Sequence, residues 1–104
     1  MVERDPLVVE LKRRLQERLG SNFKGLILFG SRARGDAAGD SDYDFLVLVG
    51  EVLDDVWYEL GAIGGDLLLE YGVVASLLPV EEARFERDTY EPLFAVVRKE
   101  GVRL

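Results

Sequence analysis

Two short apolar runs, residues 26–29 and 45–49, constrain the fold of this chain more than any other feature of its sequence. Runs of this length, rich in Leu, Ile, Val and Phe, are typical of buried strands. The first run ends in a Gly-Ser pair at residues 30–31, and the second directly follows an Asp-Tyr-Asp triplet at residues 42–44. The pattern therefore predicts two strands with the polar residues of a site between them.

The polar residues between the runs favour a site for a metal-bound nucleotide. A strand that ends in a Gly-Ser turn opening a helix presents backbone N–H groups to an anion such as phosphate. Asp42 and Asp44 are two residues apart, so in an extended segment both carboxylates point to the same face and can share a divalent cation. Taken singly, each motif has a purely structural alternative, a helix cap for the Gly-Ser pair and a solvated turn for the Asp pair. Their joint spacing favours the site.

The segment Gly-Ser-Arg-Ala-Arg-Gly-Asp at residues 30–36, continued by Ser-Asp-Tyr-Asp at 41–44, resembles the signature of the DNA polymerase beta-like nucleotidyltransferase superfamily. The spacing is similar to that of its smallest members, the minimal nucleotidyltransferases paired with HEPN-domain proteins. The resemblance implies two sets of site residues for Mg²⁺ and ATP. These are Asp42 and Asp44 for catalysis and the metal, and Gly30, Ser31, Arg32 and Arg34 for the phosphates.

The two arginines of the signature have a second interpretation. Arg32 and Arg34 flank the Gly-Ser turn, where either can neutralise charge on the departing pyrophosphate. They can also pair with the surface acids Asp36 and Asp40, in ion pairs worth about 0–1 kcal/mol each. The sequence leaves both interpretations open.

Periodicity predicts the remaining elements. Apolar residues at helical spacing indicate helices over residues 7–19, 53–71 and 90–100, with a short helix after Ser31 that ends around Gly35. Strands are expected over residues 24–29, 43–49 and 73–78, and the small-residue segment 37–41 is expected to be a flexible loop that closes over a ligand. This order predicts an α/β fold with a small sheet flanked by helices. The resemblance implies that the sheet is mixed and of the polymerase beta palm type.

Three finer expectations concern the third strand and the long helix before it. The near-continuous apolar character of residues 73–78 indicates a strand buried on both faces and closed by Pro79. Glycines at residues 61, 64 and 65 predict that the long helix bends, splits or closely approaches a neighbour. Its aromatic residues are expected in the core rather than on a nucleotide base. These are Trp57, Tyr58 and Tyr71.

Composition narrows the chemistry and the partners. The chain has neither histidine nor cysteine, which excludes His-dependent catalysis and thiolate metal sites and leaves carboxylates with a hard cation. A net charge of −7 opposes capture of duplex DNA or an anionic membrane and favours a basic protein partner. The length of 104 residues suits one domain spanning residues 1–104. No apolar run is long enough to cross a bilayer, so we expect a cytoplasmic protein.

The resemblance implies a minimal nucleotidyltransferase that transfers AMP from Mg-ATP to a hydroxyl of a protein partner, a HEPN-domain toxin, with this chain as its antitoxin. Catalytic members usually carry a third carboxylate on a neighbouring strand, and residues 73–78 contain none. A degenerate module that neutralises or scaffolds its partner by contact alone is therefore the alternative. Modification of a nucleic acid or a small molecule ranks last, since no basic groove or extra domain is evident. Homo- or hetero-oligomerisation is left open.

Overall fold

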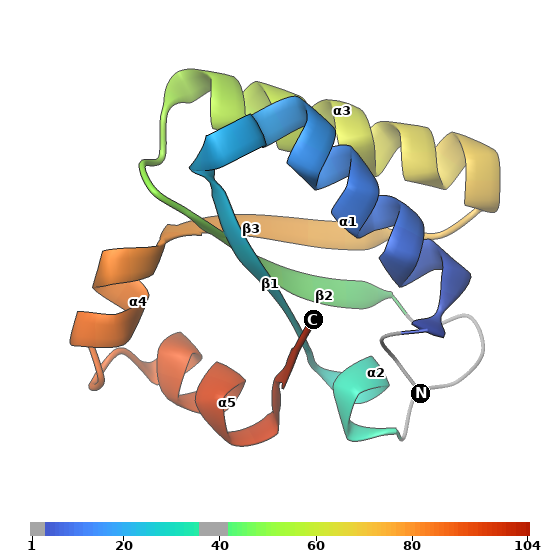
Figure 1. Ribbon diagram of the computed structural model, residues 1–104. Helices are drawn as coiled ribbons and strands as arrows, with labels where there is room; N and C mark the ends of the chain where they lie inside the picture. The colour runs from blue at the N-terminus through green and yellow to red at the C-terminus, as the bar shows by residue number, and fades with distance from the viewer. Residues whose placement is uncertain (1–3, 36–41) are drawn as a thin grey trace.

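The protein, described by a computed structural model over residues 4–35 and 42–104, is a mixed sheet with helices on both faces (Figure 1). Its strands run in the order β3-β2-β1-β4. β2 is antiparallel to β1 and parallel to β3, and β4 is antiparallel to β1. The elements are α1 (Pro6–Leu19), the 3-10 helix η2 (Gly20–Asn22), β1 (Phe23–Phe29), α2 (Ser31–Arg34), β2 (Tyr43–Val49), α3 (Asp54–Tyr71), β3 (Ala75–Glu81), α4 (Glu82–Arg87), α5 (Pro92–Glu100) and β4 (Val102–Arg103). The mixed α/β fold expected from the sequence is confirmed.

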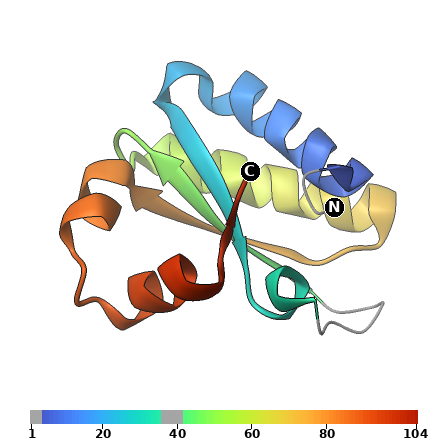
Figure 2. The ribbon, with the colours of Figure 1, turned by 60° about the horizontal axis from the view of Figure 1, so that its bottom comes forward.

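The sheet separates two helical layers, with α1 and α3 over one face and α4 and α5 over the other (Figures 1 and 2). Alternate residues of β2 enter the two cores, as the pleat of a strand requires. Phe45 and Val47 pack in the cluster under α1 and α3, while Leu46 and Leu48 pack with residues of α4 and α5. Asp44 has the same parity as Leu46, so its side chain lies on the face that carries α5.

Local sequence signals explain the first helix. The Asp5 side chain caps α1 by accepting a hydrogen bond from the Leu7 N–H at 2.9 Å, and Pro6 occupies the first turn, where its missing N–H costs nothing. The buried face of α1 is the apolar stripe found in the sequence, including Leu11 and Leu15, both fully buried. The helix expected over residues 7–19 is confirmed, and it ends at Gly20.

The third strand differs from the expectation. β3 continues through Pro79 to Glu81 instead of closing at the proline, and within the described residues its one strand neighbour is β2. An edge strand accepts a proline because the position of the missing N–H faces away from the ladder. Val74 and Ser76 are exposed, so this strand is not buried on both faces. An apolar run alone does not distinguish an edge strand from a central one.

The long helix also corrects two expectations. α3 is one unbroken helix of 18 residues, so the split expected from its glycines does not occur, and one of these glycines lies against a neighbouring strand. A Cβ placed on Gly64 would lie 3.6 Å from the Ala75 carbonyl oxygen of β3. The core interpretation of the aromatic residues is wrong, because α3 buries a different stripe, Val56, Leu60, Ile63 and Leu67. The exposed fractions are 55% for Trp57, 75% for Tyr58 and 47% for Tyr71.

The remaining expectations for elements fall in three groups. The last helix, expected over residues 90–100, is confirmed as α5, which begins at Pro92 and ends at Glu100. The loop expected over residues 37–41 lies outside the described residues. Among those that the structure does describe, no helix is both long and apolar enough to span a membrane.

Candidate functional site

The turn between β1 and α2 requires glycine at residue 30. Gly30 has φ +79° and ψ −162°, a region that residues with a side chain rarely enter, and its carbonyl accepts hydrogen bonds from the Ala33 and Arg34 N–H groups at 3.1 Å each. A Cβ built on Gly30 would lie 2.6 Å from Asp44 Oδ2. The glycine therefore gives the Asp44 carboxylate room to lie directly against the turn.

Asp44 sits where β2 meets both neighbouring strands. It pairs with Phe29, the last residue of β1, and with Ser76 of β3. Burial raises the pKa of Asp44 above its ordinary value, and the nearby charge of Asp42 raises it further. Two carboxylates that repel each other, with that of Asp44 partly withdrawn from water, favour an added cation.

The carboxylates of Asp42 and Asp44 suit a hard cation whose remaining ligands come from a bound nucleotide and water. Within the described ranges, no group of three or more acidic, His or Cys side chains is arranged to hold a metal ion. Asp42 and Asp44 supply carboxylate oxygens, and Mg²⁺ binds through one or two carboxylates together with substrate phosphates and water. The residues therefore fit a metal that arrives with a nucleotide rather than a metal held by the protein alone.

The strand beside Asp44 carries a hydroxyl where a third carboxylate would be expected. Ser76 is in register with Asp44 across the parallel β2–β3 pair, so both side chains point to the same face of the sheet. Glu81, the acid within β3, is paired with Val49 at the other end of the strand. The site on the sheet is thus a pair of carboxylates beside a serine.

The two arginines of the signature take different positions around the turn. The guanidinium carbon of Arg32 lies 4.1 Å from the centroid of the Tyr43 ring, in a cation–π contact. Arg34 Nη1 lies 3.2 Å from each carboxylate oxygen of Glu100. The alternative pairing with Asp36 and Asp40 involves acids outside the described residues.

Tyr43 connects the site to the first helix. Its hydroxyl donates a hydrogen bond to Asp5 Oδ2 at 2.8 Å, and Asp5 in turn caps α1. The Tyr43 ring stacks on Phe45 and carries Arg32 on a face. Burial, followed by the hydrogen bond to Asp5, raises the pKa of Tyr43. The start of β2, the start of α1 and Arg32 are thereby held together.

We expect Tyr43→Phe to lower the free energy of unfolding by about 1–2 kcal/mol, because it removes a partly buried hydrogen bond to a carboxylate and keeps the ring. Urea unfolding followed by circular dichroism measures the loss. Tyr58→Phe is the matched control: Tyr58 is 75% exposed, and the change should stay within about 0.5 kcal/mol. Equal stability of the two variants would show that the Tyr43–Asp5 hydrogen bond contributes nothing.

Sequence reasoning missed Glu100 as a residue of this region. Glu100, the last residue of α5, accepts a hydrogen bond from the Gly30 N–H at 3.1 Å in addition to its pair with Arg34. The contact joins residues 70 positions apart, and no local pattern at the end of a helix indicates it. An acid in the last turn is unfavourable for the helix dipole, and this was the available signal that Glu100 has another role.

A mixed α/β sheet that brings a Gly-Ser turn against an acidic strand start defines a nucleotide-transfer fold. The family model described as "Nucleotidyltransferase domain" matches residues 8–101. The chain belongs to this family, and it is a nucleotidyltransferase. It is 35% identical over 94 residues to a protein of Methanocaldococcus jannaschii named "Putative protein adenylyltransferase", with 90% of each chain covered.

Solved structures share the fold. One is a toxin–antitoxin structure with AMP-PNP, with a TM-score of 0.66 and 18% identity over 91% of this chain and 69% of that chain. Another contains tri-AMPylated Shewanella oneidensis HEPN toxin in complex with MNT antitoxin, with a TM-score of 0.62 and 18% identity over 91% of this chain and 66% of that chain. At these identities the likeness concerns the fold.

Proposed function

We propose that this chain binds Mg-ATP at the Gly30 turn and transfers AMP to a hydroxyl of a protein partner, a HEPN-domain toxin for which it is the antitoxin. The observation that carries the proposal is the Asp44 carboxylate lying against the turn, 2.6 Å from the position of a Gly30 Cβ. Related proteins agree with it, since one is named an adenylyltransferase and others occur with AMP-PNP or with an AMPylated HEPN toxin. The cytoplasmic location expected from the sequence belongs to this proposal.

Each site residue has a role in the proposed reaction. Asp42 and Asp44 hold Mg²⁺, which when bound neutralises the triphosphate, while Gly30 and Ser31 orient the terminal phosphates. Arg32 and Arg34 stand on the two sides of the turn, where they can balance charge on the departing pyrophosphate.

The transfer itself is a substitution at phosphorus. The partner's hydroxyl oxygen forms a bond to the α-phosphorus of ATP, the bond from that phosphorus to the pyrophosphate oxygen breaks, and the hydroxyl proton passes to solvent. Ser76 replaces the third carboxylate that would assist this proton transfer. We therefore expect a slow enzyme that depends mainly on positioning and on charge neutralisation.

Transfer of label from ATP to the partner tests the proposal. The chain is incubated with Mg²⁺, the product of the neighbouring gene and ATP labelled on the α-phosphate. We expect the partner to become labelled, and omission of Mg²⁺ or addition of EDTA should prevent it. Label on the γ-phosphate should not transfer, because that group leaves as pyrophosphate. A partner that stays unlabelled under all conditions would contradict the transferase proposal.

A contact-only antitoxin is the second candidate, favoured by the serine in register with Asp44. In that case the chain binds its partner tightly and neutralises it without transferring a group. Measuring binding and labelling separately distinguishes the two candidates. Neutralisation that needs no ATP would favour contact alone.

A further inference from the structure

The positive and negative charges of the chain are unevenly distributed along its sequence. Residues 35–83 contain no Lys or Arg but twelve Asp and Glu, so all thirteen basic residues lie outside this stretch. It includes β2, α3 and β3. On α3, Glu59 and Glu70 form ion pairs with Arg18 and Arg14 of α1. A partner that docks on this helix therefore meets negative charge mainly from its other acids, Asp54, Asp55 and Asp66.

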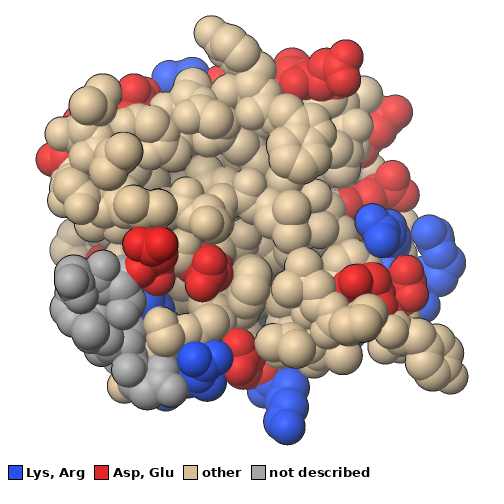
Figure 3. Space-filling view, turned by 180° about the vertical axis from the view of Figure 1, so that it is seen from behind, with Lys and Arg blue, Asp and Glu red and all other residues tan. Residues whose placement is uncertain are grey.

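The same stretch carries most of the exposed apolar surface. Eight of the eleven exposed large hydrophobic residues described in the structure lie between residues 52 and 74. Figure 3 shows the face over α3 and β3 as a broad uncharged surface with charged side chains, acidic and basic, toward its margins. An uncharged patch with a polar rim is typical of a site for protein association. The eight residues are Val52, Leu53, Trp57, Tyr58, Leu68, Leu69, Tyr71 and Val74.

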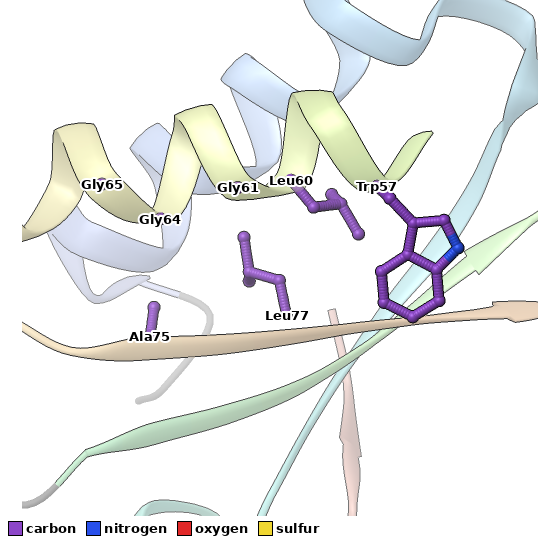
Figure 4. Close-up of a pocket in the computed structure, with 7 residues that line it drawn as sticks. All are labelled: Trp57, Leu60, Gly61, Gly64, Gly65, Ala75 and Leu77. Carbon is purple, nitrogen blue, oxygen red and sulfur yellow. The ribbon is translucent and has the colours of Figure 1, made fainter. Parts of the chain in front are cut away.

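A groove runs between α3 and the edge strand β3. Its volume is about 330 Å³, and Figure 4 shows the Ala75 and Leu77 side chains pointing from β3 toward the glycines of α3. A Cβ on Gly61 or on Gly65 would meet nothing within 4 Å, so the helix leaves open space there. Trp57 forms one end of the groove.

We propose that this groove docks a basic amphipathic helix of the protein partner. The inference rests on the proposed function for the existence of that partner, and it assigns the surface that the partner uses. The lysines and arginines of such a helix would face the acidic side chains of the margin, and its apolar side chains would enter the groove. Charge complementarity of this kind gives specificity and speeds association.

The geometry favours a helix over a strand or a second copy of the chain. The outward side of α3 carries residues at intervals of four, three, four and three from Trp57 to Tyr71, the spacing that packs against another helix. Trp57, Gly61, Leu68 and Tyr71 are exposed, and Gly64 is half-buried. Pro79 lies in β3 and lacks the N–H that an added strand would need. Two copies meeting through this face would bring like charges together, which costs affinity.

Docking in the groove would place the partner at the same end of the sheet as the carboxylates but on the opposite face. Ala75 lines the groove and points toward α3, whereas the next residue, Ser76, and its register partner Asp44 point to the face that carries α5. The groove borders the edge strand β3, so a segment adjoining the docked helix can pass around that edge. A partner held there can present a hydroxyl from such a segment to the nucleotide.

Trp57 is the single tryptophan of the chain, and its emission gives a direct readout. The probe is a synthetic amphipathic helix made of Leu and Lys without tryptophan, and the control peptide replaces every Lys with Glu. We expect the basic peptide to shift the Trp57 emission to shorter wavelength, with an affinity that falls as salt is added. The acidic peptide should cause no shift.

Gly61→Leu tests the location of the binding surface. The new side chain fills the groove, while the fold is retained, because Gly61 lies inside a helix at negative φ and leucine is the better helix former. The variant should bind the basic peptide about tenfold more weakly or worse. Val96→Ala is the matched control, because Val96 is 47% exposed on α5, outside both the patch and the groove, and its affinity should be unchanged.

The outcomes separate this inference from the proposed function. Absence of a Trp57 shift with the basic peptide, or a shift that survives in Gly61→Leu, would overturn the docking surface whether or not AMP is transferred. Self-association of the wild-type chain that Gly61→Leu abolishes would overturn it in favour of a second copy. Loss of partner labelling in Gly61→Leu with unchanged ATP binding would support it. If the wild-type chain does not label its partner, the transferase proposal is contradicted. The peptide-binding result then decides on its own whether the groove is a docking surface.

Discussion

Asp44→Asn is expected to abolish transfer of AMP while making the metal-free protein no less stable. The substitution removes a carboxylate that we assign to Mg²⁺, and a metal supplies several kcal/mol of transition-state stabilisation. The rate of partner labelling should fall by about a hundredfold or more, since each 1.36 kcal/mol is a factor of ten. Labelling of the partner with α-labelled ATP, compared at equal protein concentration, measures the loss.

The stability of the metal-free protein should rise in Asp44→Asn, although transfer of AMP falls, and the reason is electrostatic. Burial and the charge of Asp42 raise the pKa of Asp44, so the ionised carboxylate is less favourable in the folded chain than in the unfolded chain. An uncharged amide of the same shape removes that penalty at neutral pH. In the wild type the penalty disappears as the pH falls through the raised pKa of Asp44, because the carboxylate then takes up a proton and loses its charge. Thermal unfolding in EDTA should therefore show a higher midpoint for Asp44→Asn near neutrality and convergence in acid.

The control for Asp44→Asn is Asp88→Asn, at the end of α4 and away from the Gly30 turn. Its labelling rate should equal that of the wild type. Labelling that persists in Asp44→Asn would remove Asp44 from the metal site. Neutralisation of the partner that persists while labelling is lost would instead establish the contact-only antitoxin.

The sequence predicted the fold well where the pattern is local. The helix predicted over residues 7–19 and the strand predicted over 24–29 agree with α1 and β1 to within one residue, because caps and turns depend on residues within a few positions. The strand at residues 43–49 was predicted at its exact bounds. Its alternation between two cores could not be predicted, since an apolar run does not reveal which side chains face which layer.

What the sequence could not predict depends on contacts between distant segments. Trp57 is exposed because the sheet is narrow. The helix α3 lies along the edge strand β3, so the apolar stripe that contains Trp57 extends beyond the sheet and faces outward. Hydrophobic spacing identifies both stripes of α3 and does not say which one is buried. The pairing of Gly30 and Arg34 with Glu100 depends on where α5 ends, a fact of tertiary structure alone.

The signature itself specified residue types and left their geometry open. It placed Asp42 and Asp44 near the Gly-Ser turn in sequence, and the structure adds that Asp44 contacts the turn through the space of a missing side chain. It also shows that Ser76 is the residue of β3 in register with Asp44, so Ser76 is the position at which the third carboxylate is missing. The roles of the six signature residues stay predictions.

Gly30→Ala is expected to weaken ATP binding at a moderate cost in stability. The backbone at φ +79° is strained for alanine, at a cost of about 1–3 kcal/mol. The new methyl group would lie 2.6 Å from Asp44 Oδ2, and the carboxylate is the free end of a short side chain, so it moves at little further cost. The displaced carboxylate no longer lies against the turn. Calorimetric titration with Mg-ATP should show affinity reduced by at least about tenfold.

Gly20→Ala separates backbone strain from displacement of the carboxylate. Gly20 has φ +58° and ψ −133°, close to the conformation of Gly30, and a Cβ there would meet nothing within 4 Å. Both alanine variants should lose a similar amount of stability, about 1–3 kcal/mol, because both carry the same kind of strain. Gly30→Ala alone should lose affinity for Mg-ATP. Equal affinities of the two variants for Mg-ATP would contradict this prediction. The backbone strain that both variants share would then explain any loss of affinity, and contact between Asp44 and the turn would not be what holds the nucleotide.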